Sequence, residues 1–190
     1  MSYRDYLMNK LVLMEYKAIP SLEDMDWEPF YVISIFPEIE RGKRLKKADQ
    51  KPGDVPYASS TAINNGIDGF IKASRGTRVF SNCISLANSG SVGSAFYEPF
   101  AFVASDHITH LKRPGFTEWH YLFLTCVIEK QSCNFNFNRE INDARIKKMQ
   151  IMLPTTSSGE PDWDYMEQYA KNLMKRKYDQ YLAYLDGSVV

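Results

Sequence analysis

Residue types that bind metals or transfer protons are concentrated in one stretch of this sequence, which contains Asp106, His107, His110, Glu118 and His120. If Ala104–Leu111 is a β-strand, alternation places His107 and His110 on opposite faces, where they cannot share a metal ion. We therefore expect these side chains to be satisfied or exposed polar groups and predict no metal site. A small metal-dependent hydrolase or nuclease that uses Asp106, His107 and His120 remains the least favoured alternative.

Other catalytic patterns are incomplete. Ser89-Gly90-Ser91-Val92-Gly93 differs from the nucleophile turn G-x-S-x-G at its first position, where glycine permits the tight turn. The sequence lacks G-x-G-x-x-G and G-x-x-x-x-G-K-[ST], which bind dinucleotides and nucleoside triphosphates. Pro161-Asp162 is not followed by the carboxylate and lysine of a magnesium nuclease. We predict a non-catalytic protein without a cofactor.

Polar side chains suited to binding are clustered in three segments predicted to be loops. Asn pairs with adenine, Arg pairs with guanine, and Ser contacts bases or phosphates. The candidates are Ser59, Ser60, Asn64, Asn65, Asn88, Ser89, Ser91, Asn138 and Arg139. These residue types also form turns, and composition by itself favours that simpler interpretation.

The charge is strongly patterned although 23 basic and 23 acidic residues give zero net charge. Residues 21–40 carry six acids and no base, whereas residues 41–51 carry six bases and one acid, a net charge of 6 − 1 = +5. Gly and Pro punctuate the basic segment, which indicates a loop. We predict that Lys43, Arg44, Lys46 and Lys47 contact phosphates.

The order of predicted elements indicates a β-rich α+β domain. Apolar residues from Tyr3 to Met14 recur at helical spacing, and Ser21 with Asp24 forms a predicted capping box. Short runs rich in β-branched and aromatic residues predict strands, at residues 30–39, 67–71, 83–87, 95–97, 102–105 and 108–111. Residues 121–130 and 141–148 are predicted to be short helices, and 149–153 is a short apolar run.

A long helix is predicted from Asp162 to Leu185, after a loop rich in Ser and Gly. Its apolar stripe needs a partner helix and consists of Trp163, Ala170, Met174, Tyr178, Tyr181 and Leu185. The partner would be the N-terminal helix, a second copy or another subunit. We divide the chain into an N-terminal helix (1–20), a globular domain (21–154), and a linker with the C-terminal helix (155–190).

The cellular context follows from composition. A hydrophobic content of 44% exceeds that of disordered chains. Cys83, Cys126 and Cys133 are odd in number and lack C-x-x-C pairing, which argues against disulfides and a cysteine zinc site. The longest uncharged run, residues 79–97, is too rich in Ser, Asn and Gly for a membrane span. We expect a cytoplasmic protein.

An ordered set of short motifs resembles the target recognition domain of type I restriction-modification specificity subunits and of related type IIG and IIB systems. The motifs are Phe36–Leu45 with "RGK", Gly53–Ser60 followed by Asn64-Asn65-Gly66, Ala87–Gly93, Ala104–His107, Phe137–Arg139 and Ile151–Pro154. The resemblance implies a globular domain that binds double-stranded DNA and a helix that serves as spacer and docking surface. It also implies methyltransferase partners, in some systems with a restriction or translocase subunit.

The chain departs from that family in one respect. Specificity subunits usually carry two recognition domains and two helical regions, and this chain has room for one of each. The chain would then be a half-subunit, a single-site specificity protein or an excised domain. A half-subunit would form a homodimer through its C-terminal helix, and its two-fold symmetry would predict a palindromic, bipartite target. The main alternative is a protein-interaction or antirestriction module with the same fold.

Overall fold

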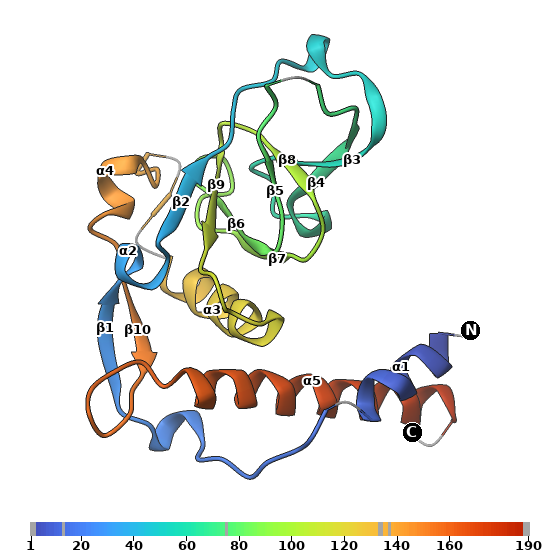
Figure 1. The fold of residues 1–190 in the computed structure, drawn as a ribbon, viewed down its shortest axis with the longest axis vertical. Helices are drawn as coiled ribbons and strands as arrows, with labels where there is room; N and C mark the ends of the chain where they lie inside the picture. Colours follow the sequence, from blue (N-terminus) through green and yellow to red (C-terminus); the bar gives the residue numbers. More distant parts are fainter. Residues whose placement is uncertain (1–2, 13, 75, 133–134, 137, 188–190) are drawn as a thin grey trace. The chain divides into compact units, whose positions relative to one another are not determined.

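The computed structural model describes residues 3–12, 14–74, 76–132, 135–136 and 138–187. The chain forms two compact units: Glu28–Leu153 is the larger unit, and Met1–Trp27 with Pro154–Val190 form the smaller unit. Sheets and helices are mixed, which confirms the α+β class (Figure 1). Cys133, Asn134 and Phe137 lie outside the described residues.

Two four-stranded sheets build the larger unit. The first has the order β2-β9-β6-β7 and is antiparallel, with β2 at Glu38–Arg41, β9 at Ile108–Lys112, β6 at Cys83–Ala87 and β7 at Ala95–Glu98. The second has the order β4-β3-β8-β5, with β4 at Ile67–Ile71, β3 at Pro52–Ala58, β8 at Phe102–Ala104 and β5 at Val79–Phe80. Strands β3 and β8 are parallel, and the other pairs of this sheet are antiparallel.

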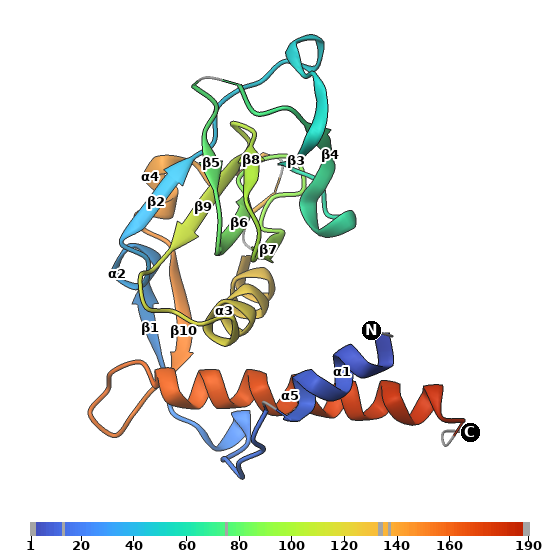
Figure 2. The same ribbon diagram turned by 45° about the vertical axis from the view of Figure 1, so that its right-hand side comes forward.

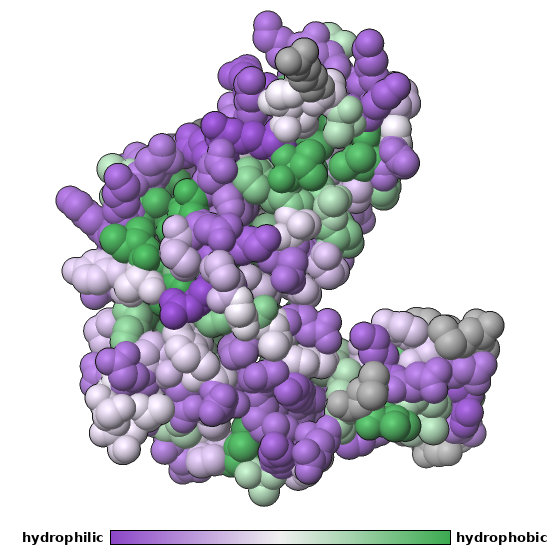
Figure 3. Space-filling model, viewed as in Figure 1, coloured by the Kyte–Doolittle hydropathy of each residue, from purple (hydrophilic) through white to green (hydrophobic). Residues whose placement is uncertain are grey.

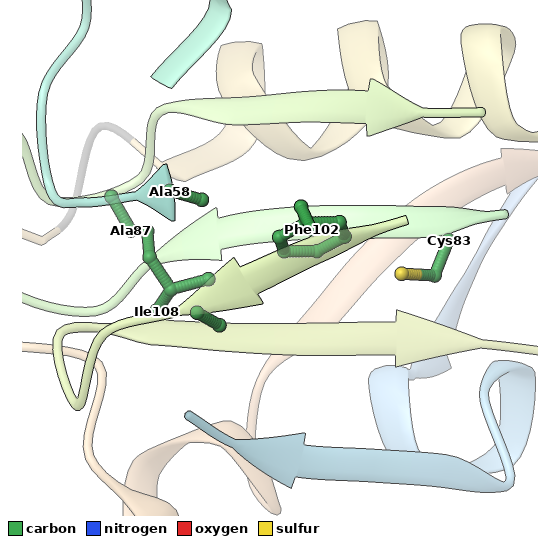
Figure 4. Packing of buried hydrophobic residues seen from close by; sticks show 6 residues of the cluster. Ala58, Cys83, Ala87, Phe102 and Ile108 are labelled. Atoms are coloured by element: carbon green, nitrogen blue, oxygen red, sulfur yellow. The ribbon is translucent and has the colours of Figure 1, made fainter. Parts of the chain in front are cut away.

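The core of the larger unit lies between these two sheets. Phe102 of β8 lies over Cys83 and Ala87 of β6, and Ala58 and Ile108 close the cluster (Figure 4). Helix α3 (Glu118–Gln131) packs against β6 and β7 (Figure 2). All five residues of β6 are buried, because β6 is a central strand.

The predicted strand at residues 30–39 is wrong. The structure has β1 (Trp27–Tyr31), a helical turn α2 (Val32–Ile35) and then β2. Val32, Ile35 and Phe36 are all buried, and their i, i+3, i+4 spacing suits a helical turn rather than alternation. Strand β1 pairs with β10 (Gln150–Pro154), which is the apolar run predicted at residues 149–153.

Strands β3 and β5 are not among the predicted strands, and β3 contains Pro52, Gly53 and Pro56, residues that are unfavourable inside a strand. Strand β3 tolerates them because it pairs with β4 through two register shifts and with β8 only at Tyr57 and Ala58. The two short helices that were predicted begin at other residues than expected, because their N-caps set the first residue. Helix α3 begins at Glu118 because Thr117 caps it, and α4 (Asp143–Ile146) begins at Asp143 because Asn142 caps it.

The smaller unit packs the N-terminal segment against a long helix. Helix α5 (Trp163–Leu185) matches the predicted helix, and α1 (Tyr3–Val12) is the shorter N-terminal helix (Figure 1). The predicted capping box at Ser21 and Asp24 is present and starts a 3₁₀ turn at Leu22–Asp24. Arg4 pairs with Asp186, so the N-terminal segment runs antiparallel to α5.

Candidate nucleic-acid interface

The β8–β9 turn (residues 105–107) joins three loops of the larger unit. The backbone N–H groups of Gly42 and Lys43 bond to the carbonyls of Ile108 and Ala104, at 2.9 and 3.1 Å. Ser105 N–H bonds to Ala58 O at 3.0 Å. The basic loop (residues 42–51), the loop 59–66 and the loop 88–94 therefore meet here, since Asn88 N–H bonds to the carbonyl of His107 at 2.9 Å.

Glycines permit these close approaches. A Cβ atom at Gly42 would lie 2.1 Å from the carbonyl oxygen of Ser105, so only glycine fits the "RGK" position. Gly90 has φ of +64°, and a Cβ atom there would lie 2.5 Å from Ser60 Oγ. Ser91 N–H also bonds to Ser60 O at 3.1 Å. Two of the motif glycines are thus explained by loop packing.

A groove of about 460 Å³ opens between the basic loop and the β8–β9 turn. Its polar lining consists of Arg44, Lys46, Lys47, Gln50, Tyr57, Ser59, Asp68, Ser105, Asp106 and His107. Three cations and two carboxylates thus line one surface. Cations suit phosphates, whereas carboxylates accept hydrogen bonds from base amino groups, so the groove combines both chemistries.

Tyr57 lies at the end of β3 and is 5% exposed. Burial, and secondarily the carboxylates of Asp106 and Asp68, raise the pKa of Tyr57. The side chain is therefore a neutral phenol at physiological pH, and it can donate or accept a hydrogen bond in the groove.

The structure brings together some of the predicted binding residues. Arg44, Lys46, Lys47 and Ser59 line the groove, and Ser60 and Ser91 join two loops beside it. Lys43 is exposed but is not among the lining residues, and its backbone anchors the basic loop.

The pair Asn64 and Asn65 lies at the tip of the loop 59–66. Both residues have positive φ, 51° and 52°, and both are exposed. Asparagine tolerates this left-handed conformation better than most residues, so the pair forms the turn as well as supplying exposed amides.

Asn88 and Ser89 are buried, at 2% and 4% exposure. The Asn88 amide donates to Thr109 Oγ1 at 3.1 Å, and the Ser89 hydroxyl contacts His107 Nδ1. Both side chains therefore support the turn that carries His107.

Asn138 and Arg139 are exposed in a separate turn that does not line the groove. Asn138 N–H bonds to Asn136 Oδ1 at 3.0 Å, and the Arg139 guanidinium lies 5.8 Å from the ring centre of Phe135. Ile141 N–H bonds to Asn88 O at 2.9 Å, which ties this turn to the loop 88–94.

Figure 3 shows hydrophilic residues at the tip of the larger unit beyond β3 and β4 and a hydrophobic patch in the region of these two strands. Exposed apolar side chains interrupt this surface, for example Phe70 at 61% exposure. The lining of the groove itself is mainly polar, with Leu45 as its aliphatic residue.

The groove includes Gln50, Tyr57, Asp68, Asp106 and His107, which sequence reasoning did not select for binding. A signal was present for two of them. The motif Ala104–His107 is part of the resemblance, and its Asp106 and His107 lie between two predicted strands, where a turn side chain is exposed.

Ala104–Leu111 is not one strand, the condition under which His107 and His110 would lie on opposite faces, because the turn at Ser105–His107 separates β8 from β9, in agreement with the strands predicted at 102–105 and 108–111. The three histidines lie on different elements. His110 is buried, stacks on Phe80 and bonds to Glu40 O at 2.8 Å, and burial lowers its pKa. His120 forms the capping box of α3 with Thr117.

The predicted partner stripe of α5 is divided along the helix. Ala170 is buried, whereas Trp163, Met174 and Tyr178 are half-buried. Tyr181 and Leu185 are 41% and 44% exposed. The N-terminal helix is one of the partners we considered, and α1 does pack against α5.

A family model described as "Type I restriction modification DNA specificity domain" matches residues 25–181. This chain belongs to that family. The match covers both the sheets that form the groove and most of α5, so the specificity domain in this sense includes the long helix.

Relatives of this specificity domain agree with that assignment. The chain is 36% identical over 151 residues to the specificity subunit S.BcgI of a type II restriction enzyme from Heyndrickxia coagulans. That match covers 78% of this chain and 44% of the relative. The chain therefore spans less than half the length of this curated relative.

Two solved structures share the fold. The S subunit of a type I restriction-modification system from M. genitalium has a TM-score of 0.59 and 18% identity, covering 97% of this chain and 50% of that one. The HsdS subunit from Thermoanaerobacter tengcongensis has a TM-score of 0.54 and 14% identity, covering 97% and 45%. No helix in the described part of the chain has both the length and the apolar character of a bilayer span.

Proposed function

We propose that this specificity domain binds double-stranded DNA sequence-specifically and directs the catalytic subunits of a restriction-modification system to their site. The groove carries the proposal, because it places three cations beside hydrogen-bonding groups on a rigid turn. Cations set affinity and register through phosphates, and the other groups contact base edges.

The proposed contacts follow from the placement of each residue. Arg44, Lys46 and Lys47 contact phosphates, with Lys43 at the start of the same loop. Ser59, Ser60, Asn64, Asn65 and Ser91 contact bases or backbone, and Asn138 and Arg139 do so from the second turn. Asn88 and Ser89 contribute from buried positions by holding the β8–β9 turn.

The test of this function is selection of bound duplexes from a random pool by the full chain, with and without a methyltransferase subunit. We expect one enriched sequence, and a two-fold repeat of it where two copies bind. Recovery of duplexes without a shared sequence in both conditions would overturn the proposal and favour the protein-interaction alternative.

Charge reversal of the basic loop tests the phosphate contacts. We expect Lys46→Glu with Lys47→Glu to weaken binding to all duplexes at least about tenfold, because like charges then face the phosphates. The measurement is fluorescence anisotropy at several salt concentrations. Lys147→Glu with Lys148→Glu is the matched control, since this exposed pair is also adjacent and lies outside the groove. Equal losses in both variants would contradict the assignment.

We further propose that the chain carries out no catalysis itself and acts with methyltransferase subunits, in some assemblies with a restriction or translocase subunit. Support comes from the name of the relative, a specificity subunit of a restriction enzyme. The end of α5 would be the docking surface, because Tyr184 and Leu185 are 67% and 44% exposed. A second copy docking there would form a homodimer.

Light scattering tests this docking surface. We expect a dimer of the full chain or a complex with an added adenine methyltransferase subunit, and we expect Tyr184→Ser with Leu185→Ser to weaken either by removing apolar contact area. Lys177→Ser, an exposed polar position on the same helix, is the control. The proposal would be refuted if the full chain stays monomeric and forms no complex with the methyltransferase subunit.

A further inference from the structure

His107 lines the groove and is not one of the residues proposed above to contact DNA. Its side chain is 53% exposed, whereas His110 and His120 are 5% and 7% exposed. It lies on the β8–β9 turn, whose backbone is bonded to three loops. The imidazole is therefore accessible while its attachment to the protein is rigid.

Buried groups orient the imidazole of His107. The hydroxyl of Ser89, a residue that is 4% exposed, contacts Nδ1. The backbone N–H of His107 donates to Ser105 Oγ at 3.2 Å, and its carbonyl accepts from Asn88 N–H. When one ring nitrogen has a fixed partner, the ring orientation is set and the other nitrogen serves the ligand.

A carboxylate lies near the second ring nitrogen, Nε2. Asp106 Oδ1 lies 3.9 Å from Nε2, and a carboxylate favours a proton on the nearby nitrogen. With its proton on Nε2, the ring can donate from Nε2 and accept at Nδ1 from the Ser89 hydroxyl.

We propose that His107 is a specificity-determining residue that donates a hydrogen bond from Nε2 to an acceptor on a base edge, and that Ser89 is its positioning residue. This inference rests on the proposed DNA-binding function. The adjacent carboxylate argues for a base rather than a phosphate at this ring, because Asp106 Oδ1 lies 3.9 Å from Nε2 and repels a phosphate at that position, whereas the cations of the groove lie on the basic loop. A base edge instead provides a neutral acceptor, and its amino groups can donate to Asp106.

The test compares full-chain variants on the sequence selected by the unmodified protein. For His107→Ala we expect about a tenfold loss of affinity for that sequence, little change for an unrelated duplex, and relaxed selection at one base pair. Glutamine places an amide near Nε2 and asparagine places one near Nδ1. His107→Gln should therefore retain more selectivity than His107→Asn.

Ser89→Ala tests the positioning role with a readout that a simple packing defect would not produce. We expect relaxed selection at the same base pair as for His107→Ala, and the double variant should lose no more than His107→Ala. Thermal unfolding of each variant and Lys147→Ala, outside the groove, are the controls.

The outcomes distinguish this inference from the function on which it rests. If the unmodified chain selects no sequence, both fail. If it selects a sequence and His107→Ala keeps the same selectivity, or weakens all duplexes equally, base reading by His107 is wrong while the DNA-binding function stands. If asparagine retains as much selectivity as glutamine, the assignment to Nε2 is overturned.

Discussion

Glu98 shows how one side chain can tie the stability of the fold to pH. It is 1% exposed at the end of β7, opposite Cys83, and its Oε1 accepts a hydrogen bond from Ser85 Oγ at 3.1 Å. Burial raises the pKa of Glu98 from 4.5 to about 7 and the pKa of the Cys83 thiol to about 12. Both groups are therefore held mainly in their neutral forms near pH 6.

Glu98→Gln should stabilise the protein at alkaline pH. The raised pKa means that the folded state binds more protons than the unfolded state between pH 4.5 and about 7, so stability falls as pH rises through this window. At about pH 8 the variant should be more stable by as much as about 3 kcal/mol, and at about pH 4 the two proteins should be similar. Urea unfolding at several pH values across this range measures the free energy of unfolding of both proteins. A stability difference that does not change with pH would contradict the explanation.

At the scale of elements, one side chain of α5 secures the N-terminal segment. Asn172 Nδ2 donates to Lys17 O at 2.6 Å, and its Oδ1 accepts from Lys17 N–H at 3.2 Å. Gln168 donates to Glu15 O at 3.0 Å, and Tyr165 donates to Pro20 O at 3.1 Å. The segment without regular structure is therefore bonded to the helix by side chains, whereas α1 contributes apolar packing through the buried Leu7.

Asn172→Ala should loosen residues 15–20 from α5. The loss of two hydrogen bonds to Lys17 is expected to cost about 1–3 kcal/mol locally, because the backbone groups lose their partner. Hydrogen exchange of the Lys17 amide is the measurement, and Lys177→Ala, an exposed position on the same helix that lines no pocket with this segment, is the control. Unchanged exchange at Lys17 would show that these hydrogen bonds do not hold the segment.

For the whole molecule, the net charge is zero although basic side chains are clustered locally. The total of 23 bases and 23 acids predicts little general attraction to DNA, yet Arg44, Lys46 and Lys47 lie in one groove. Binding by the isolated chain should therefore depend on few phosphate contacts.

The salt dependence of DNA affinity should reflect this small number. Three phosphate contacts predict a slope of about −2.7 for log affinity against log salt, which corresponds to about a 40-fold loss between about 50 mM and about 200 mM salt. Titrations with the selected duplex measure the slope. A slope twice as steep would indicate further phosphate contacts outside the groove.

The sequence by itself determined the class of the fold, the long helix and the basic loop. These depend on local patterns: apolar spacing over residues 162–185, short β-branched runs, and a cluster of bases among Gly and Pro. Strand β3 escaped prediction because its prolines are tolerated only by the irregular pairing with β4. The helical turn α2 does have a local signal, the i, i+3, i+4 spacing of Val32, Ile35 and Phe36, but the run of β-branched and aromatic residues there favoured a strand.

Only the tertiary structure decided which polar residues share one surface. The basic loop is distant in the sequence from Asn88, Ser89 and His107. Hydrogen bonds around the β8–β9 turn bring these segments together. Burial then separates supporting residues from exposed ones, which composition cannot do. The physical reason is that both proximity and burial arise from long-range pairing of strands, whereas sequence patterns report only the conformation of neighbouring residues.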